Sequence, residues 1–75
     1  SGLAGIAYWI NAYYELPTEE KVQKGDELVA RIKEFADKEY ASGRTTAISD
    51  GELDTMISLL DPQRHAYFLS KSKNR

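Results

Sequence analysis

Apolar and polar residues follow one another along this chain with the spacing of helices. Before Pro17 the apolar side chains recur every three or four positions, which is the pattern of an amphipathic helix. The helix must stop there, because the residue that precedes a proline is pushed out of the α region. The sequence therefore predicts a first helix over about residues 4–15, with a stripe of Leu3, Ile6, Ala7, Ile10, Tyr13 and Tyr14.

A second amphipathic stretch carries clear signals at both of its ends. Asp26 is a good N-cap residue, and Gly43 stands where a left-handed residue closes a helix. Between them an apolar stripe alternates with charged positions, so the sequence predicts a helix over residues 27–41. The stripe consists of Leu28, Val29, Ile32, Phe35, Ala36 and Tyr40.

A third helix is predicted by its first residues. The run Ser49-Asp50-Gly51-Glu52 fits the capping box, in which each side chain bonds the other residue's backbone donor, and Ile48 and Leu53 stand where a hydrophobic staple forms. Asp61-Pro62 ends this helix, which we expect over residues 50–60.

Beyond Pro62 the apolar pattern weakens. Residues 63–69 are expected to add no more than a short fourth helical turn that docks on the bundle. Residues 70–75 read as a frayed, flexible C-terminal tail. The connection over residues 16–25 is expected to cross one end of the bundle, with Val22 as its anchor.

These elements predict an all-α fold, a small three-helix bundle that forms a single domain over residues 1–69. If Phe35 lies in its core, Phe35→Ala would cost about 3–5 kcal/mol. The side chains expected to be buried together are Ile6, Ile10, Leu28, Ile32, Phe35, Leu53, Met56 and Ile57.

Composition narrows the class of protein. The chain has 75 residues, a formal net charge of −2 and no cysteine, so disulfides, thiolate metal sites and cysteine nucleophiles are excluded. A small domain without disulfides favours a reducing, cytoplasmic location. The charge gives no basic footprint for nucleic acid, and the apolar run of residues 3–10 is too short to span a membrane. We therefore expect neither a nucleic-acid nor a membrane partner.

Candidate catalytic chemistry is sparse. An enzyme site needs convergent groups, but His65 is the only histidine and is expected to be exposed or partly packed. The acidic residues alternate with basic ones, as on a solvated helix face. The sequence thus indicates no catalytic, cofactor-binding or metal-ligating residue.

Two features support hypotheses about binding. Four aromatic residues stand close together in the first helix, and they either fill the core or fill it in part and offer a partner interface; they are Tyr8, Trp9, Tyr13 and Tyr14. Arg44, Thr45 and Thr46 follow the second helix and could contact an anion, a carboxylate or phosphate. The alternative is that Arg44 caps the carbonyls of that helix.

The sequence also resembles a known family in several places. These are SGLAGIAYWIN at residues 1–11, the helix start at Asp26, and the stretches 42–44 and 48–53. They are similar to the C-terminal region of 2-isopropylmalate synthase and homocitrate synthase-like enzymes, whose relatives include the Re-type citrate synthase. The resemblance extends over residues 1 to about 57, and its motifs do not form a catalytic signature.

The resemblance implies a parent enzyme of amino-acid biosynthesis with a (β/α)8 barrel. Such enzymes bind a divalent metal of the Mg²⁺ or Mn²⁺ type and condense acetyl-CoA with a 2-oxo acid, as acyltransferases. The helical segments after the barrel help to cover the active site and build the dimer. This chain would then be a fragment, a C-terminal accessory domain whose partners are the barrel and a second subunit. No active-site residue of the family is carried over to it, and we do not expect the fragment alone to be catalytic.

Two other functions stay open at this point. The chain could be an independent helical module that binds a protein or peptide on the face of its first helix. It could also bind acyl-CoA directly through Arg44, Lys21 and Lys24.

Overall fold

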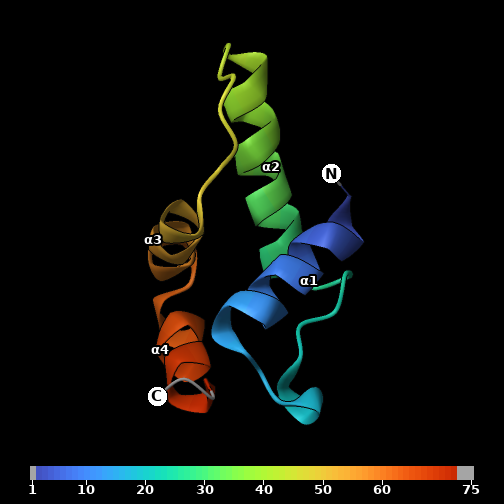
Figure 1. Ribbon diagram of the computed structural model, residues 1–75, viewed down its shortest axis with the longest axis vertical. Helices are drawn as coiled ribbons and strands as arrows, with labels where there is room; N and C mark the ends of the chain where they lie inside the picture. The colour runs from blue at the N-terminus through green and yellow to red at the C-terminus, as the bar shows by residue number, and fades with distance from the viewer. Residues whose placement is uncertain (1, 73–75) are drawn as a thin grey trace.

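Four α-helices and one short 3₁₀ helix make up residues 2–72, which are the residues described by the computed structural model. The α3 and α4 helices follow each other along one side, and α1 packs across the lower part of α2 (Figure 1). None of the helices within residues 2–72 is both long and apolar enough to cross a membrane. The predicted all-α fold is confirmed. The helices are α1 (Leu3–Tyr14), η1 (Thr18–Glu20), α2 (Glu27–Ala41), α3 (Asp50–Leu60) and α4 (Pro62–Lys71).

The predicted helix starts are confirmed by their hydrogen bonds. The carboxylate of Asp26 accepts the backbone N–H of Leu28 at 2.9 Å and so caps α2. At α3 the backbone N–H of Glu52 donates to the Ser49 hydroxyl at 3.1 Å, and the N–H of Ser49 donates to the Glu52 carboxylate at 2.9 Å. These two bonds complete a capping box.

The C-terminal end of α2 also follows its sequence signal. Gly43 adopts a φ of 104°, a left-handed conformation that side chains disfavour. Its N–H donates to the carbonyl of Tyr40, and the N–H of Arg44 donates to that of Glu39, each at 3.1 Å. This pair of bonds is the Schellman motif, and it satisfies two carbonyls that the end of the helix would otherwise leave unpaired.

The fourth helix is longer than the sequence predicted. In place of a short turn over residues 63–69, α4 has ten residues and includes Ser70 and Lys71, which were assigned to the tail. Asp61 accepts the backbone N–H of Arg64 at 3.2 Å, and Pro62 occupies the first turn, where a proline is preorganised for a helix. Asp61-Pro62 therefore ends α3 and also begins α4. Residues 73–75 of the predicted tail lie outside the described residues.

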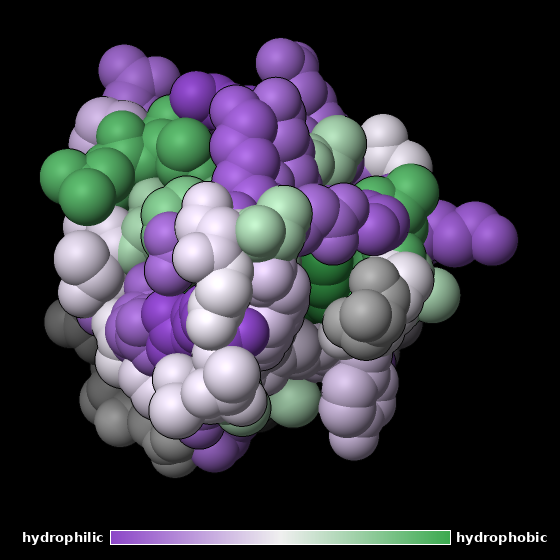
Figure 2. All heavy atoms as spheres, turned by 90° about the horizontal axis from the view of Figure 1, so that it is seen from above, coloured by the Kyte–Doolittle hydropathy of each residue, from purple (hydrophilic) through white to green (hydrophobic). Residues whose placement is uncertain are grey.

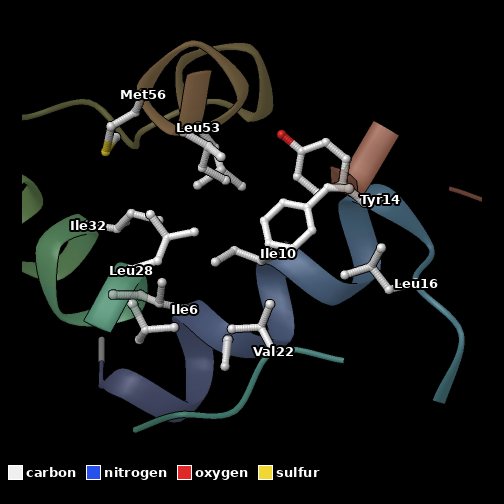
Figure 3. Close-up of a cluster of buried hydrophobic side chains, with 13 residues drawn as sticks. Ile6, Ile10, Tyr14, Leu16, Val22, Leu28, Ile32, Leu53 and Met56 are labelled. Carbon is white, nitrogen blue, oxygen red and sulfur yellow. The ribbon is translucent and has the colours of Figure 1, made fainter. Parts of the chain in front are cut away.

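The core forms where α1, α3 and the first half of α2 meet. Figure 3 shows Ile6, Ile10 and Tyr14 of α1 pointing toward side chains of α2 and α3. Phe68 of α4 is also buried. The fully assembled core consists of Ile6, Ala7, Ile10, Tyr14, Leu16, Val22, Leu28, Val29, Ile32, Leu53, Met56, Ile57 and Phe68.

Phe35 was wrongly assigned to this core. Its side chain is 40 % exposed, because burial along α2 ends at Ile32. The second half of α2 extends beyond α1 and α3 (Figure 1), so the stripe continues without a covering helix. The predicted loss of about 3–5 kcal/mol for Phe35→Ala, which assumed full burial, no longer holds.

The connection between α1 and α2 is anchored in two ways. Val22 is buried, as predicted. In addition, the side-chain amide of Asn11 donates to the Val22 carbonyl at 3.0 Å and accepts the Val22 N–H at 2.8 Å. The role of Asn11 was missed, since nothing close to it in the sequence indicates a partner eleven residues away.

We expect Asn11→Ala to destabilise the fold by about 1–2 kcal/mol, since both backbone groups of Val22 lose their partner while the chain still buries the valine side chain. Urea denaturation followed by circular dichroism measures this loss. Asn11→Asp, which keeps an acceptor for the N–H but no donor for the carbonyl, should fall between Asn11→Ala and the wild type. Equal stability of all three proteins would contradict this role.

Candidate functional site

The four aromatic residues of α1 separate into an inner and an outer pair. Tyr14 is only 2 % exposed and belongs to the core, and the indole N–H of Trp9 donates to Asp50 of α3 at 2.7 Å. Tyr8, which is 74 % exposed, and Tyr13 lie on the outside. Of the four, only Tyr8 offers most of its side chain to a partner, because Tyr13 is 37 % exposed and its ring packs edge-on against that of Tyr14.

Tyr14 belongs to a cluster of ionisable groups that the sequence did not reveal. Its hydroxyl donates to Oδ1 of Asp54 at 2.6 Å, and Nε2 of His65 lies 2.8 Å from the same oxygen. The cluster joins α1, α3 and α4 through one carboxylate. His65 was expected to be exposed or partly packed, and it is partly buried. Its contact with Asp54 was not foreseen, since Asp54 stands 11 positions before it and 40 positions after Tyr14.

The electrostatics of this cluster identify Asp54 as its anion. The hydrogen bond from Tyr14, followed by that from His65, lowers the pKa of the Asp54 carboxyl. Burial, followed by the bond to Asp54, raises the pKa of the Tyr14 hydroxyl. Because a carboxylate only accepts hydrogen bonds, Nε2 of His65 is the donor in its contact with Asp54.

The chemistry of the cluster is limited within the described part of the chain. The His65 ring contacts the Asp54 carboxylate, and the Tyr14 hydroxyl beside it donates its proton to the same Asp54 oxygen instead of to the ring. An aspartate that orients a histidine is one part of a catalytic triad, and the remaining parts are not assembled here. The cluster therefore acts first as a link between three helices.

Arg44 does not have the partners that the sequence analysis considered. Its Nε donates to the Thr46 carbonyl at 2.9 Å, and its two terminal nitrogens donate to both oxygens of Glu52 at 2.7 and 2.9 Å. Further bonds reach Glu39 at 3.2 Å and the Ala47 carbonyl at 3.1 Å. The N–H donors of the guanidinium are thus used within the domain, and none of these bonds goes to a carbonyl of α2.

Thr45 and Thr46 do not make an anion site beside it. Both side chains are exposed, and the guanidinium faces the Thr46 carbonyl oxygen instead of leaving a donor for a ligand. The hydrogen bonds of Arg44 instead link the end of α2 to the start of α3. We call this set of bonds, from Arg44 to Glu39, Thr46, Ala47 and Glu52, the clasp.

The structure also separates the three cations of the acyl-CoA hypothesis. Arg44 follows the end of α2, whereas Lys21 and Lys24 precede its start. A helix of 15 residues is about 22 Å long, so Arg44 and the two lysines stand at opposite ends of α2. They do not form one phosphate-binding surface.

Acid is expected to weaken the clasp. The pKa of Glu52 falls to about 2, first because Arg44 donates to it and second because the Ser49 N–H does. A carboxyl group whose pKa is lower in the folded state stabilises the fold above its unfolded value, near 4, and that contribution is lost as the pH falls toward 2. The Tm difference between wild type and Glu52→Gln should therefore be constant above about pH 5 and shrink below about pH 4.

Thermal melts between pH 7 and pH 2 measure this difference. The comparison with Glu52→Gln is needed because the pKa values of Asp26 and Asp54 are also lowered, so that acid weakens the fold at those residues too. Glu34→Gln is the matched control, since Glu34 forms an exposed ion pair with Lys38 at 3.5 Å. A Tm difference for Glu52→Gln that did not change with pH, or that changed as it does for Glu34→Gln, would contradict the prediction.

Hydrophobic side chains reach the surface at separate places, with hydrophilic ones between them (Figure 2). One such place is a groove between α2 and α3 with a volume of about 480 Å³. Its apolar wall consists of Phe35, Met56, Leu59 and Leu60; we call it the α2–α3 groove. Within residues 2–72 no three His, Cys, Asp or Glu side chains lie together so as to hold a metal ion.

Comparison with known proteins gives two relatives. The chain is 44 % identical over 63 residues to the Citrate (Re)-synthase of Clostridium kluyveri and 38 % identical over 63 residues to that of Syntrophus aciditrophicus. The match covers 84 % of this chain but only 14 % and 10 % of the two relatives. No protein-family model and no solved structure matches the chain. The chain is therefore homologous to a short segment of Citrate (Re)-synthases.

Proposed function

We propose that this chain is the helical accessory domain of an acyltransferase that condenses acetyl-CoA with a 2-oxo acid. The observation that carries the proposal is the 44 % identity to a Citrate (Re)-synthase over most of this chain and a small part of that enzyme. A segment of this size would support a catalytic site built elsewhere. The lack of assembled catalytic groups within residues 2–72 accords with that role.

The names of the two relatives indicate which 2-oxo acid the parent enzyme would use. A citrate synthase adds the methyl carbon of acetyl-CoA to the ketone of oxaloacetate and releases CoA when the thioester is hydrolysed. Oxaloacetate is therefore the 2-oxo acid that we propose for the parent enzyme. A divalent metal of the Mg²⁺ or Mn²⁺ type would act there as a Lewis acid on the 2-oxo acid. The described residues offer no cluster for such an ion, so its ligands would belong to the rest of the enzyme.

Within that enzyme the domain would cover the active site and contribute to contact with a second subunit. Its construction supports such a task. No side-chain nitrogen or oxygen buried within residues 2–72 lacks a hydrogen-bond partner. Side-chain hydrogen bonds between helices hold the domain together as one unit. Exposed apolar side chains, among them Tyr8, Phe35 and Leu59, leave surface for packing.

The test is an activity assay on the full product of the gene. The purified protein with Mg²⁺ or Mn²⁺ should release free thiol from acetyl-CoA when oxaloacetate is added and form citrate in equal amount. Pyruvate, 2-oxoisovalerate and 2-oxoglutarate serve as alternative acceptors, and omission of the acceptor is the control. Thiol release with another acceptor would keep the reaction class and change the substrate. If no acceptor yields thiol, the proposal fails.

A further inference from the structure

The apolar stripe of α2 is longer than the core that covers it. Leu28 and Ile32 are buried, and Phe35 follows them on the same helix face at the next turn. Its ring is nevertheless 40 % exposed. An amphipathic stripe normally ends where its partner surface ends, so the second half of α2 carries apolar residues that residues 2–72 cover only in part.

The α3 helix extends this uncovered surface. Leu59 is 78 % exposed, more than any other large apolar side chain of the described chain. It stands at the α2–α3 groove, which Phe35 borders from the other helix. A prominent leucine beside an apolar hollow is a typical anchor point of a packed interface.

The carboxylate at the edge of the groove is already paired with an arginine of the domain. Glu52 lines the groove, but both of its oxygens accept hydrogen bonds from Arg44. The Ser49 hydroxyl accepts the Glu52 N–H as part of the cap. Covering the groove would therefore leave no carboxylate without a partner, which is the usual obstacle to burying charged residues.

The aromatic face of α1 is less suited to the same task. Tyr8 is widely exposed, but its neighbour Trp9 is partly packed against the core and directs its N–H to Asp50. Tyr14 is buried altogether. An isolated exposed tyrosine needs no special explanation, whereas a hollow with an apolar wall and two exposed apolar side chains, Phe35 and Leu59, does.

We propose that the α2–α3 groove is the surface by which this domain docks on the remainder of its own polypeptide. This inference rests on the proposed function. The matched segment makes up only 14 % and 10 % of the relatives, so most of such a chain lies outside it and can supply an occupant. The occupant is an apolar helix face or loop from outside residues 1–75, and it covers Leu59 and Phe35.

Photo-crosslinking of the full gene product tests the proposal. p-Benzoylphenylalanine is placed at position 59, and at position 8 as the matched control on the other exposed face. After irradiation, position 59 should crosslink within one polypeptide to peptides outside residues 1–75, and position 8 should do so at least tenfold less. Crosslinks from position 59 to a second copy or only to residues 2–72, no crosslink, or equal yields from both positions would overturn it.

A second measurement keeps the test independent of the crosslinker. Leu59→Asp in the full gene product should speed amide hydrogen exchange in residues 49–60 by about tenfold or more, the factor expected when burial of one leucine is lost. Tyr8→Asp should leave that exchange unchanged. Unchanged exchange in Leu59→Asp would overturn the proposal. Because Leu59 is largely exposed within the domain, its substitution leaves the core contacts of the domain in place.

The two proposals fail separately. Thiol release by the wild-type protein, measured on the same preparation, reports on the condensation reaction. A protein that releases thiol but shows no contact at position 59 would refute the docking surface alone. A protein that makes the predicted crosslinks without releasing thiol from any acceptor would refute the reaction alone.

Discussion

Replacement of Phe68 by alanine is expected to destabilise the domain by about 3–5 kcal/mol, which is much of the stability of so small a fold. The ring is 1 % exposed and lies 5.3 Å from the Tyr14 ring, centre to centre. The Arg64 guanidinium also lies over the Phe68 ring, 5.1 Å from its centre. Its removal opens a cavity between α1 and α4 that neighbouring side chains cannot fill.

Phe35→Ala is the matched control, because these are the two phenylalanines of the chain. Phe35 is 40 % exposed, so its truncation should cost about 1 kcal/mol. Urea denaturation of both variants, followed by circular dichroism, gives the comparison. If the two losses were equal, or if Phe35→Ala were the more damaging, α4 would not pack as described and the core would lie further along α2.

The second large effect is expected at Asp54. Asp54→Ala should cost about 2–3 kcal/mol, because the Tyr14 hydroxyl and the His65 ring both lose their acceptor. The hydroxyl belongs to a side chain that is 2 % exposed, so water replaces the lost carboxylate poorly. A buried donor without a partner costs more than the hydrogen bond itself contributed.

A double-mutant cycle separates this effect from a general loss of charge. In the Tyr14→Phe background no hydroxyl is left without a partner, so Asp54→Ala should cost about 1–2 kcal/mol less than in the wild type. Asp37→Ala is the control at an exposed ion pair with Lys33 and should change stability by less than about 0.5 kcal/mol. Losses at Asp54 and Tyr14 that simply added would show that the two side chains are not coupled.

The elements that could be predicted from the sequence are those whose signals are local. The N-cap at Asp26, the capping box at Ser49 and the left-handed Gly43 each act within five residues of a helix end, and α2 and α3 have their predicted bounds. Burial of Val22 could also be predicted, since it is the one aliphatic residue among the polar residues that follow Pro17 in the connection. Such features depend on chain geometry that any three or four neighbouring residues already determine.

The errors concern contacts between distant parts of the chain. Phe35 satisfies the helical period as well as Ile32 does, and only the extent of α1 and α3 decides which of them is covered. The Asp54–His65 contact depends on how α4 folds back after Pro62. The partners of Arg44 were missed for a related reason: Glu52 was recognised as part of the capping box and was not considered as an acceptor for a second donor.

Glu52 consequently occupies a position with almost no tolerance to substitution. One oxygen accepts the Ser49 N–H and one N–H of Arg44, and the other accepts a second N–H of Arg44. Aspartate has the charge but is one methylene too short to span both partners. Glutamine has the length but turns an N–H₂ group toward one donor or the other. A single side chain thus sets both where α3 begins and how α3 is held to α2, so a change that is conservative for the helix is not conservative for the fold.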